Sequence, residues 1–504
     1  MSDEPAAPAE AAPSDPAPAR DVATDEASAP GSSDPHADLE ASEGGFDRKF
    51  FWALVAVAIA TRLVWLLWVH PPWQFVFSDM SKYLERAQDL VEHGFRPGIR
   101  PLAWQAWGTH YVLALPLLIF GKKALWAAAL VWAGMSAASV PLAYGLACRV
   151  ATRPAIPKFF GIVMLVWYPH LSNAGYFLSE TPFLFFQIWS TYRLVVLVQD
   201  GRGAWVAGLA SAGAFAIRPQ AAMFFVLVLV AWWVGRRRLT HVQPKHLVGV
   251  AVPLLLMLGW SLFRFHAHTG YWAGVAENAN MNLTAGRCHN IVTQAFQTEA
   301  ALRHSEATGN TRDGRRVSLP GYRILARRLP DEHPLGLRPA LGDTTIRFVG
   351  YVGDPQIHRE LRAQCYAKTG VLEQVRYSIV NLSLLWFIGH QWPEIELKPE
   401  QGRGWLLPPL VGFKHAYQIL VWIPSLLGIV LGLRAIRRNP GLCFCAFHLL
   451  TSMTVAAVFF GTIRLRMPYD PYAILLATEV WIRAWGRARG WWRRRRRHET
   501  AREA

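Results

Sequence analysis

The feature that most constrains the fold of this chain is a series of apolar blocks, most of them about 16–24 residues long. A helix of roughly 20 apolar residues crosses the hydrocarbon core of a bilayer. Of the 504 residues, 52% are hydrophobic and 17% are charged, whereas a soluble domain has about 25% charged residues. The pattern excludes a soluble globular enzyme and a fibrous chain, and it predicts an all-α polytopic membrane protein.

The apolar blocks predict about 10–11 transmembrane helices, at 50–69, 105–120, 124–147, 159–173, 182–199, 203–217, 220–235, 246–265, 411–433, 441–461 and 468–485. Basic clusters lie just beyond four block ends: Arg149 with Arg153 and Lys158, Arg236–Arg238, Arg434 with Arg437 and Arg438, and Arg483 with Arg493–Arg497. Such clusters mark cytoplasmic ends. All four clusters can lie on the cytoplasmic side of the membrane only if one early block does not cross it. The block at 105–120, interrupted by Pro116, is the best candidate for a re-entrant or interfacial helix. The model with all basic clusters inside has both termini in the cytoplasm and places the chain in the inner cell membrane.

The spacing of the blocks divides the chain into domains. The expected parts are a disordered acidic tail (1–46), an N-terminal membrane module (47–265) with a first extracytoplasmic loop (70–104), an extracytoplasmic segment (266–410), the last three spans (411–485) and a basic cytoplasmic tail (486–504). The segment 266–410 is too long for a linker and has helical patterns at 354–368 and 371–388, so it predicts a small folded unit. Its Cys288 and Cys365 can form a disulfide if it faces an oxidising compartment.

The net charge of +17 does not require a nucleic-acid partner, because cytoplasmic loops and phosphate-binding clefts of membrane proteins carry the same excess. No group of His, Cys, Asp and Glu has the spacing of metal ligands. We therefore expect membrane lipids as partners, no nucleic acid, no metal and no cofactor.

The first loop contains an amphipathic helix that begins near Asp79. Its apolar positions recur every three to four residues, with Lys82, Glu85, Arg86 and Asp89 towards water, which is typical of a helix lying along the membrane interface. Asp79 therefore lies close to the membrane plane, either as a helix cap or as a functional acid.

Four motifs follow one another along the chain. They are "D-x-x-x-Y-x-x-x-A-x-x-L" from Asp79, "GYFLSETPFLFF" (Gly175–Phe186), "AGAFAIRPQAAMF" (Ala212–Phe224) and "RLRMPYDPYAILLA" (Arg464–Ala477). Together with Arg62 in the first span, this order resembles polyprenyl-phosphate-sugar glycosyltransferases of the GT-C superfamily, in particular protein O-mannosyltransferases and aminoarabinose transferases. The resemblance covers about residues 50–265 and 440–485. It implies a lipid-linked sugar donor and an active site on the extracytoplasmic side.

The candidate site follows from this resemblance and from the chemistry of the transfer. An acceptor hydroxyl or amine that attacks the sugar must lose a proton, and a carboxylate can take it. The leaving phosphate is already ionised and needs guanidinium groups rather than an acid. The expected catalytic residues are Asp79 and Glu180, and the expected substrate-binding residues are Tyr83, Arg100, Arg218, Arg264, Arg464 and Arg466.

Each candidate also has a structural interpretation. Arg218 precedes Pro219 and can cover carbonyls freed by the helix break, and Arg62 can pair with Glu180 or with main chain. Glu180 can be that partner, a group that positions the acceptor, or a helix-start acid. The Arg464 and Arg466 pair is either a phosphate clamp or reaches for lipid headgroups.

The leading hypothesis is a glycosyltransferase that moves a sugar from a polyprenyl-phosphate donor to a lipid, glycan or protein acceptor. One alternative is a transporter or flippase of lipid-linked intermediates, which predicts polar residues at mid-membrane and paired repeats. Another is a glycan polymerase or ligase, which the Arg- and His-containing segment 266–410 keeps open.

Overall fold

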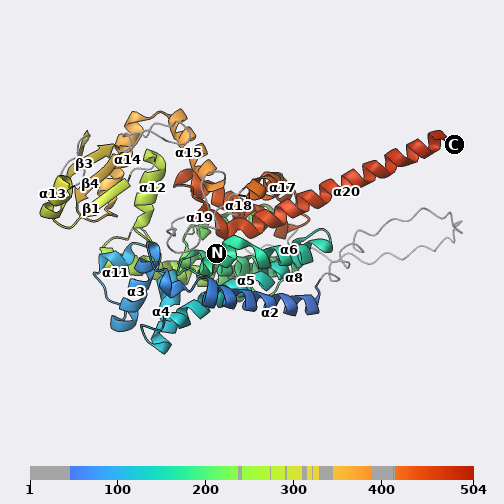
Figure 1. Ribbon diagram of the computed structural model, residues 1–504, viewed down its shortest axis with the longest axis horizontal. Helices are drawn as coiled ribbons and strands as arrows, with labels where there is room; N and C mark the ends of the chain where they lie inside the picture. Colours follow the sequence, from blue (N-terminus) through green and yellow to red (C-terminus); the bar gives the residue numbers. More distant parts are fainter. Residues whose placement is uncertain are drawn as a thin grey trace, which may run out of the picture. The chain divides into compact units, whose positions relative to one another are not determined.

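The computed structural model describes residues 46–235, 241–272, 274–289, 292–308, 315–319, 322–328, 344–386, 412–413 and 415–503. Helices dominate these ranges (Figure 1). Before the long inserted segment they are α2 (Arg48–Val64), α3 (Asp79–His93), α4 (Gly108–Phe120), α5 (Leu125–Val150), α6 (Ala155–Val166), α7 (Tyr168–Asn173), α8 (Glu180–Asp200), α9 (Ala204–Ile217), α10 (Ala221–Gly235) and α11 (Pro244–Thr269). After it they are η8 (Gln418–Trp422), α17 (Ile423–Arg434), α18 (Pro440–Val458), α19 (Ile463–Arg466), η9 (Met467–Tyr469) and α20 (Asp470–Glu503).

Within the described ranges, six helical runs are long and apolar enough to cross a membrane: Arg48–Gln74, Leu125–Val150, Glu180–Asp200, Pro244–Thr269, His415–Arg434 and Pro440–Val458. The apolar helices α4, α6, α9 and α10 are shorter, at 10–17 residues, so the described ranges contain six runs of spanning length against the 10–11 predicted. A helix pairs its own backbone N–H and C=O groups, which find no hydrogen-bond partner in hydrocarbon. The predicted all-α polytopic membrane fold is confirmed.

The two predicted tails, 1–46 and 486–504, relate differently to the described residues. Of the predicted tail 1–46, all but Phe46 lies outside the described residues. At the other end α20 continues without a break through the stretch 486–503, so the predicted basic tail is the last part of this helix.

Helix α4 corresponds to the block expected to be re-entrant or interfacial. Near its start, Gln105 binds Arg86 of α3, and just beyond its end Lys122 Nζ donates to Glu92 Oε2 of the same helix at 2.8 Å. The two helices therefore lie side by side along most of their length, as Figure 1 also shows. Both ends of α4 stay with α3, which favours a helix that does not cross the bundle.

The opposite end of the bundle is held by contacts between other helix ends. Asn439 Nδ2 donates to Val150 O at 2.7 Å, and Arg149 Nη1 donates to Asp200 Oδ1 at 3.0 Å. These residues belong to the end of α5, the end of α8 and the start of α18. Two of the predicted basic clusters, those that begin at Arg149 and Arg434, therefore lie at this end.

The inserted segment, of which 270–386 is described with gaps, contains a small sheet as well as helices. Its elements are α12 (Asn278–Cys288), β1 (Val292–Phe296), α13 (Glu299–Thr308), β2 (Arg315–Leu319), β3 (Tyr322–Arg328), β4 (Thr344–Val349), α14 (Pro355–Lys368) and α15 (Val371–Trp386). The four strands have the order β1-β4-β3-β2, with β1 and β4 parallel and the other pairs antiparallel. The two predicted helices of this segment are present as α14 and α15, whereas the sheet was not predicted.

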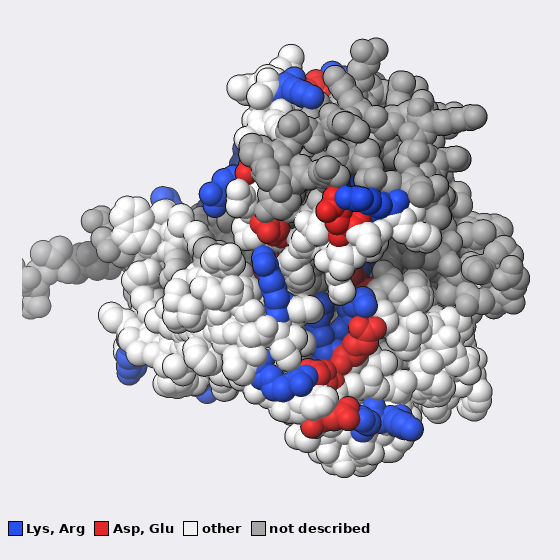
Figure 2. Space-filling view, turned by 90° about the vertical axis from the view of Figure 1, so that its left-hand side faces the viewer, with Lys and Arg blue, Asp and Glu red and all other residues white. Residues whose placement is uncertain are grey.

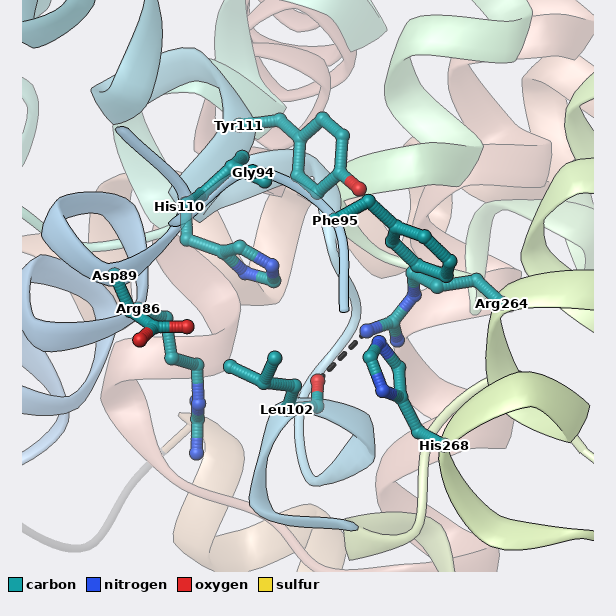
Figure 3. Close-up of a pocket in the computed structure, with 10 residues that line it drawn as sticks. Arg86, Asp89, Gly94, Phe95, Leu102, His110, Tyr111, Arg264 and His268 are labelled. Carbon is teal, nitrogen blue, oxygen red and sulfur yellow. Dashed lines mark hydrogen bonds between the residues drawn. The ribbon is translucent and has the colours of Figure 1, made fainter. Parts of the chain in front are cut away.

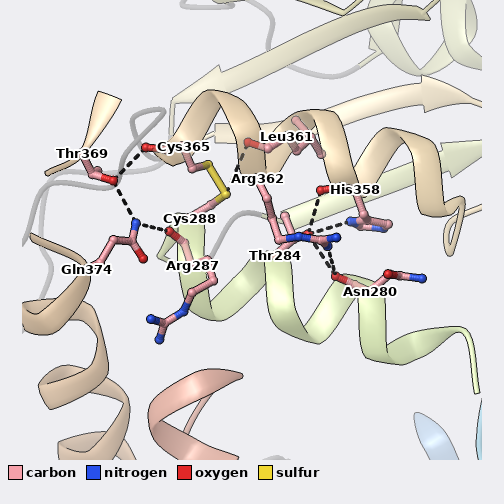
Figure 4. Close-up of a disulfide and its surroundings, with 10 residues drawn as sticks. All are labelled: Asn280, Thr284, Arg287, Cys288, His358, Leu361, Arg362, Cys365, Thr369 and Gln374. Atoms are coloured by element: carbon pink, nitrogen blue, oxygen red, sulfur yellow. Dashed lines mark hydrogen bonds between the residues drawn. A yellow bond between two sulfur atoms is a disulfide. The ribbon is translucent and has the colours of Figure 1, made fainter. Parts of the chain in front are cut away.

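A disulfide between Cys288 and Cys365 joins α12 to α14, with their Cα atoms 5.4 Å apart (Figure 4). On the other side, α12 packs tightly on the residue that follows α18, because a Cβ atom at Gly286 would lie 1.2 Å from Phe459 O. Only glycine permits this approach. The disulfide-bonded unit is therefore docked on the chain that leads into α19.

Replacing Cys288 and Cys365 by Ala should lower the free energy of unfolding by roughly 4 kcal/mol, because the disulfide closes a long loop of the unfolded chain. The sequence separation is 77 residues. Thermal unfolding of the purified protein measures the loss, and gel mobility without reductant reports the disulfide. As a control, Cys148→Ala removes a cysteine that is not in a disulfide. An unfolding temperature that does not change in the double variant contradicts the prediction.

Candidate functional site

Charged side chains from four separate segments meet at one end of the helical bundle. Arg464 Nη1 donates to Asp79 Oδ2 at 2.6 Å, and Arg464 Nε donates to Glu180 Oε1. Arg218 Nη2 donates to the same Glu180 oxygen at 2.5 Å. We call Asp79, Glu180, Arg218 and Arg464 the charged cluster. The structure thus brings together members of all four sequence motifs.

Each member of the charged cluster lies at a helix end or break. Asp79 and Glu180 are the first residues of α3 and α8, where unpaired backbone N–H groups and the helix dipole favour a carboxylate. Arg218 lies between α9 and α10, in an extended conformation that the following proline favours. Arg464 lies in the short helix α19. The helix ends thus fix the backbone position of every charge.

The charged cluster has an accessible pair and a buried pair. The side chains of Asp79 and Arg464 are 38% and 18% exposed, whereas those of Arg218 and Glu180 are 8% and 0% exposed. Ser179 Oγ accepts from Arg218 Nε at 3.1 Å and from Nη2 at 2.9 Å. Side chains, rather than freed carbonyls, are therefore the observed partners of Arg218. A ligand that arrives from outside meets Asp79 and Arg464 first.

The helix-cap interpretation does not account for Asp79. The cap position is Ser78, which makes no side-chain cap bond, and Asp79 Oδ1 instead accepts from Gln105 Nε2 at 3.3 Å. Ser78 has φ 52° and ψ −129°, a conformation that a non-glycine residue rarely adopts. Such backbone strain persists where the surrounding structure holds it, often beside functional groups.

Two further residues of α3 lie on the same face as Asp79. Tyr83 is 6% exposed. Its pKa is raised mainly by burial and, to a smaller extent, by the negative charge of Asp79. Arg86 is 8% exposed and donates to Gln105 Oε1, so it joins the network that ends at Asp79. The prediction that Arg86 points to water was wrong, because a residue seven positions after Asp79 shares its face of the helix.

The charges of the cluster are stabilised by one another. Burial by itself lowers the pKa of the Arg464 guanidinium, but the carboxylates of Glu180 and Asp79 raise it more, and the net shift is upward. Two carboxylates face two guanidinium groups, and Arg86 adds one more positive charge. With all five side chains ionised, the network is one unit positive, which suits an anionic ligand. Across the described ranges, no three His, Cys, Asp or Glu side chains lie together in a way that can hold a metal ion.

Arg466 does not join Arg464. Its Nε donates to Asp470 Oδ1 at 3.1 Å, and its guanidinium lies 3.9 Å from the centre of the Tyr417 ring. Its side chain is 5% exposed and that of Asp470 is 0% exposed. The predicted clamp formed by both arginines is therefore absent, and Arg466 belongs to a separate buried ion pair.

Arg264 and Arg62 bind main-chain carbonyl groups. Arg264 Nη1 donates to Leu102 O at 2.7 Å, beside a small pocket that His110 and His268 also line (Figure 3). Arg62 Nη1 donates to Leu165 O at 2.8 Å. Of the interpretations given for Arg62, the structure thus shows the partner in the main chain rather than Glu180. Both side chains are buried, and Arg264 Nη2 also donates to the carbonyl of Gln105, whose side chain binds Asp79.

A cavity of about 570 Å³ lies beside the charged cluster, between α3, the chain around Trp104 and Tyr351 of the inserted segment. We call it the α3 cavity. Figure 2 shows basic and acidic side chains gathered in a hollow on this face of the molecule. Arg100, predicted as a substrate ligand, lies nearby: its Nε donates to Glu277 Oε1 at 2.9 Å, and its guanidinium lies 4.5 Å from the Tyr351 ring centre.

The fold and the charged cluster define a multi-pass α-helical membrane protein with an ion-pair network at one end. No family profile matches the sequence, and no curated protein matches it. Among solved structures, the chain is similar to ArnT from Cupriavidus metallidurans in the apo state, with 14% identity, 85% of this chain and 76% of that chain covered, and a TM-score of 0.35. It is also similar to the same protein bound to undecaprenyl phosphate, with 15% identity, 85% and 77% coverage, and a TM-score of 0.33.

Proposed function

We propose that this protein is an integral-membrane glycosyltransferase that moves a sugar from a polyprenyl-phosphate donor to an extracytoplasmic lipid, glycan or protein acceptor. The observation that carries the proposal is the accessible pair of the charged cluster. In this pair the carboxylate of Asp79 lies 2.6 Å from the guanidinium of Arg464. A group that takes a proton thus lies next to a group that binds a phosphate.

Arg464 is the proposed ligand of the donor phosphate. The leaving group of the transfer is a phosphate that is already ionised, and a guanidinium group neutralises its growing charge through charge-assisted hydrogen bonds. Glu180 orients Arg464 from behind, and Arg218 binds the same oxygen of Glu180 and holds that carboxylate in place. Glu180 and Arg218 are therefore positioning residues in this proposal, because their burial keeps them from the substrate.

Asp79 is the proposed general base. When the donor phosphate binds Arg464, the guanidinium divides its hydrogen bonds between phosphate and carboxylate, and Asp79 becomes a stronger base. The acceptor oxygen or nitrogen then forms a bond to C1 of the sugar while the bond from C1 to the phosphate oxygen breaks. The acceptor proton passes to Asp79, and polyprenyl phosphate leaves with the electron pair. This single displacement inverts the configuration at C1.

Two observations support an extracytoplasmic position for the charged cluster. The Cys288–Cys365 disulfide belongs to the unit docked on the chain that leads into Arg464, and disulfides persist in oxidising compartments. Arg149 and the cluster that begins at Arg434 lie at the other end of the bundle, where the positive-inside rule places the cytoplasm. Polyprenyl-phosphate sugars presented on the outer face are the donors that match this position.

A direct test is stabilisation of the purified protein by polyprenyl phosphate. A ligand that binds only the folded state, present at 100 times its Kd, stabilises by about 2.7 kcal/mol. We therefore expect polyprenyl phosphate to raise the unfolding temperature in detergent or nanodiscs. The matched ligand without the phosphate, the free polyprenol, should have little effect because it offers nothing to Arg464.

The matched variant for this test is Arg464→Gln, which should abolish the difference between the two lipids. Lys122→Gln, which removes an exposed cation paired with Glu92, should leave it intact. Equal stabilisation by polyprenyl phosphate and polyprenol contradicts the proposed donor class.

A further inference from the structure

The α3 cavity lies outside the charged cluster and has no role in the transfer step derived above. It is formed by the polar face of α3, by Trp104, by Tyr351 of the inserted segment, and by apolar residues on either side of these rings in the sequence: Ile99, Pro101, Leu102 and Val352. Its volume of about 570 Å³ is within the range of small-molecule sites, roughly 300–1,000 Å³. The chemistry of its walls indicates what it can bind.

The charges that line the α3 cavity are balanced. Two bases, Lys82 and Arg86, and two acids, Glu85 and Asp89, come from consecutive turns of α3. Lys82 Nζ lies 3.2 Å from Glu85 Oε2, and both side chains are more than half exposed. A wall of this kind offers both donors and acceptors without a net charge, so it favours a ligand with many hydroxyl groups over a simple anion.

The opposite wall of the α3 cavity is aromatic and rigid. The rings of Trp104 and Tyr351 meet edge to face, with centroids 6.1 Å apart and an interplanar angle of 86°. Arg100 stacks on Tyr351. Trp104 is packed so closely on Gly353 that a Cβ atom there would lie 2.7 Å from the indole. Flat, pre-positioned rings of this kind bind the C–H face of a sugar ring at little cost in side-chain entropy.

The cavity and the proposed base share one helix. With a rise of 1.5 Å per residue, Arg86 lies about 10 Å along α3 from Asp79, which is close to the length of two linked sugar rings. Arg86 also binds Gln105, whose amide donates to Asp79. Gln105 therefore links Arg86, on the wall of the cavity, to the proposed base Asp79.

We propose that the α3 cavity is the acceptor subsite and that the acceptor is a saccharide, either a glycan or the sugar headgroup of a glycolipid. The inference rests on the proposed function for the direction of transfer, but the ligand class rests on the cavity alone. Balanced charges on one wall and two fixed rings on the other recognise a short sugar chain. A peptide acceptor would not need the rigid edge-to-face pair.

Binding can be measured without any donor. The full-length protein in nanodiscs is titrated into fluorescently labelled saccharides of two to four rings, both neutral and amino-substituted, and fluorescence anisotropy reports binding. We expect at least one saccharide to bind and its affinity to fall tenfold or more in Glu85→Gln and in Tyr351→Ala. The Glu85 side chain is 61% exposed, so replacing it does not disturb the packed core of the protein. Glu92→Gln, on the same helix outside the cavity wall, is the matched control and should bind as the wild type does.

The outcomes separate this inference from the proposed function. Polyprenyl phosphate binding with no saccharide bound at millimolar concentration overturns the acceptor subsite and leaves the donor proposal standing. Saccharide binding without any response to polyprenyl phosphate leaves the subsite standing and removes the transfer. Binding that survives both cavity variants, or binding of unglycosylated peptides alone, also overturns the inference. Comparison of free saccharides with glycolipids in the same nanodiscs distinguishes a glycan from a glycolipid source.

Discussion

Asp79→Asn should lower the rate of sugar transfer by about 10²–10⁴-fold, the contribution of a general base. Asparagine has nearly the shape of aspartate, but its single carbonyl oxygen can replace only one of the two oxygens that accept from Gln105 and Arg464, and it cannot take the acceptor proton. The variant also removes one of the two carboxylates that compete with phosphate for Arg464. The affinity for polyprenyl phosphate should therefore be retained or rise while turnover falls.

Transfer from a radiolabelled polyprenyl-phosphate sugar, measured with purified protein, gives the rate, and the thermal shift described above gives the donor affinity. The matched control is Asp200→Asn, the same chemical change at the opposite end of the bundle, where Asp200 pairs with Arg149. This variant should transfer at the wild-type rate. Transfer by Asp79→Asn near the wild-type level removes Asp79 as the base, and a parallel loss of donor affinity and turnover indicates a structural role instead.

The helices of the fold could be predicted because hydrocarbon leaves few alternatives. A long apolar block must form a helix that satisfies its own backbone. A proline can mark a break in such a block, although Pro116, Pro141 and Pro253 lie inside continuous helices. Pro219 separates α9 from α10 as expected. In the inserted segment, the helices at 355–368 and 371–386 follow the predicted stretches closely. The polytopic fold thus follows from block length and from breaks alone.

The four-stranded sheet could not be predicted in the same way. Its strands have 5–7 residues, too few to show a clear period. Sequences such as "RRVSL" and "YRILARR" carry charged residues where an alternating pattern would place apolar ones. The parallel pairing of β1 with β4 also joins residues about 50 positions apart, Val292 with Thr345. Such pairing depends on tertiary contacts, which one sequence does not reveal.

The members of the charged cluster could be chosen from the sequence, but their partners could not. A charged residue at the end of an apolar block is costly unless it is paired. This argument and the motifs led to Asp79, Glu180, Arg218 and Arg464, but also to Arg100, Arg264 and Arg466, which have other partners in the structure. Which carboxylate meets which guanidinium depends on how α3, α8 and α19 pack together. Their roles in catalysis stay predictions that the variants must test.

The Arg466 side chain shows where spacing in the sequence misleads. Residues two apart on a helical turn point about 200° away from each other, because a helix has 3.6 residues per turn. Arg464 and Arg466 therefore leave the short helix on different sides. Arg464 points to Glu180 and Asp79, whereas Arg466 points to Asp470. The same helical geometry explains why Arg86 shares the face of Asp79, because residues seven positions apart are separated by almost two full turns.

Because Arg464 and Arg466 have different partners, we expect their substitution by Gln to have different effects. Arg464→Gln should lower transfer by about 10²–10³-fold, the cost of removing one donor that stabilises a developing anion, and it should weaken polyprenyl phosphate binding. The Glu180–Arg218 pair remains in place, and Asp79 is partly exposed, so the fold should survive. Arg466→Gln should instead leave the fully buried carboxylate of Asp470 without its ion-pair partner. Breaking a buried pair in this way costs about 3–5 kcal/mol of stability.

The two variants remove the same charge from neighbouring positions of one short helix, so their difference cannot come from net charge or from a general disturbance of α19. Transfer per folded molecule and the response to polyprenyl phosphate are compared with the unfolding temperature in both. Arg466→Gln should lose stability and keep its response to the lipid, while Arg464→Gln should show the reverse. If both variants lose the response to polyprenyl phosphate equally at equal stability, the two arginines act as one clamp after all, and the ion pair between Arg466 and Asp470 must open when the donor binds.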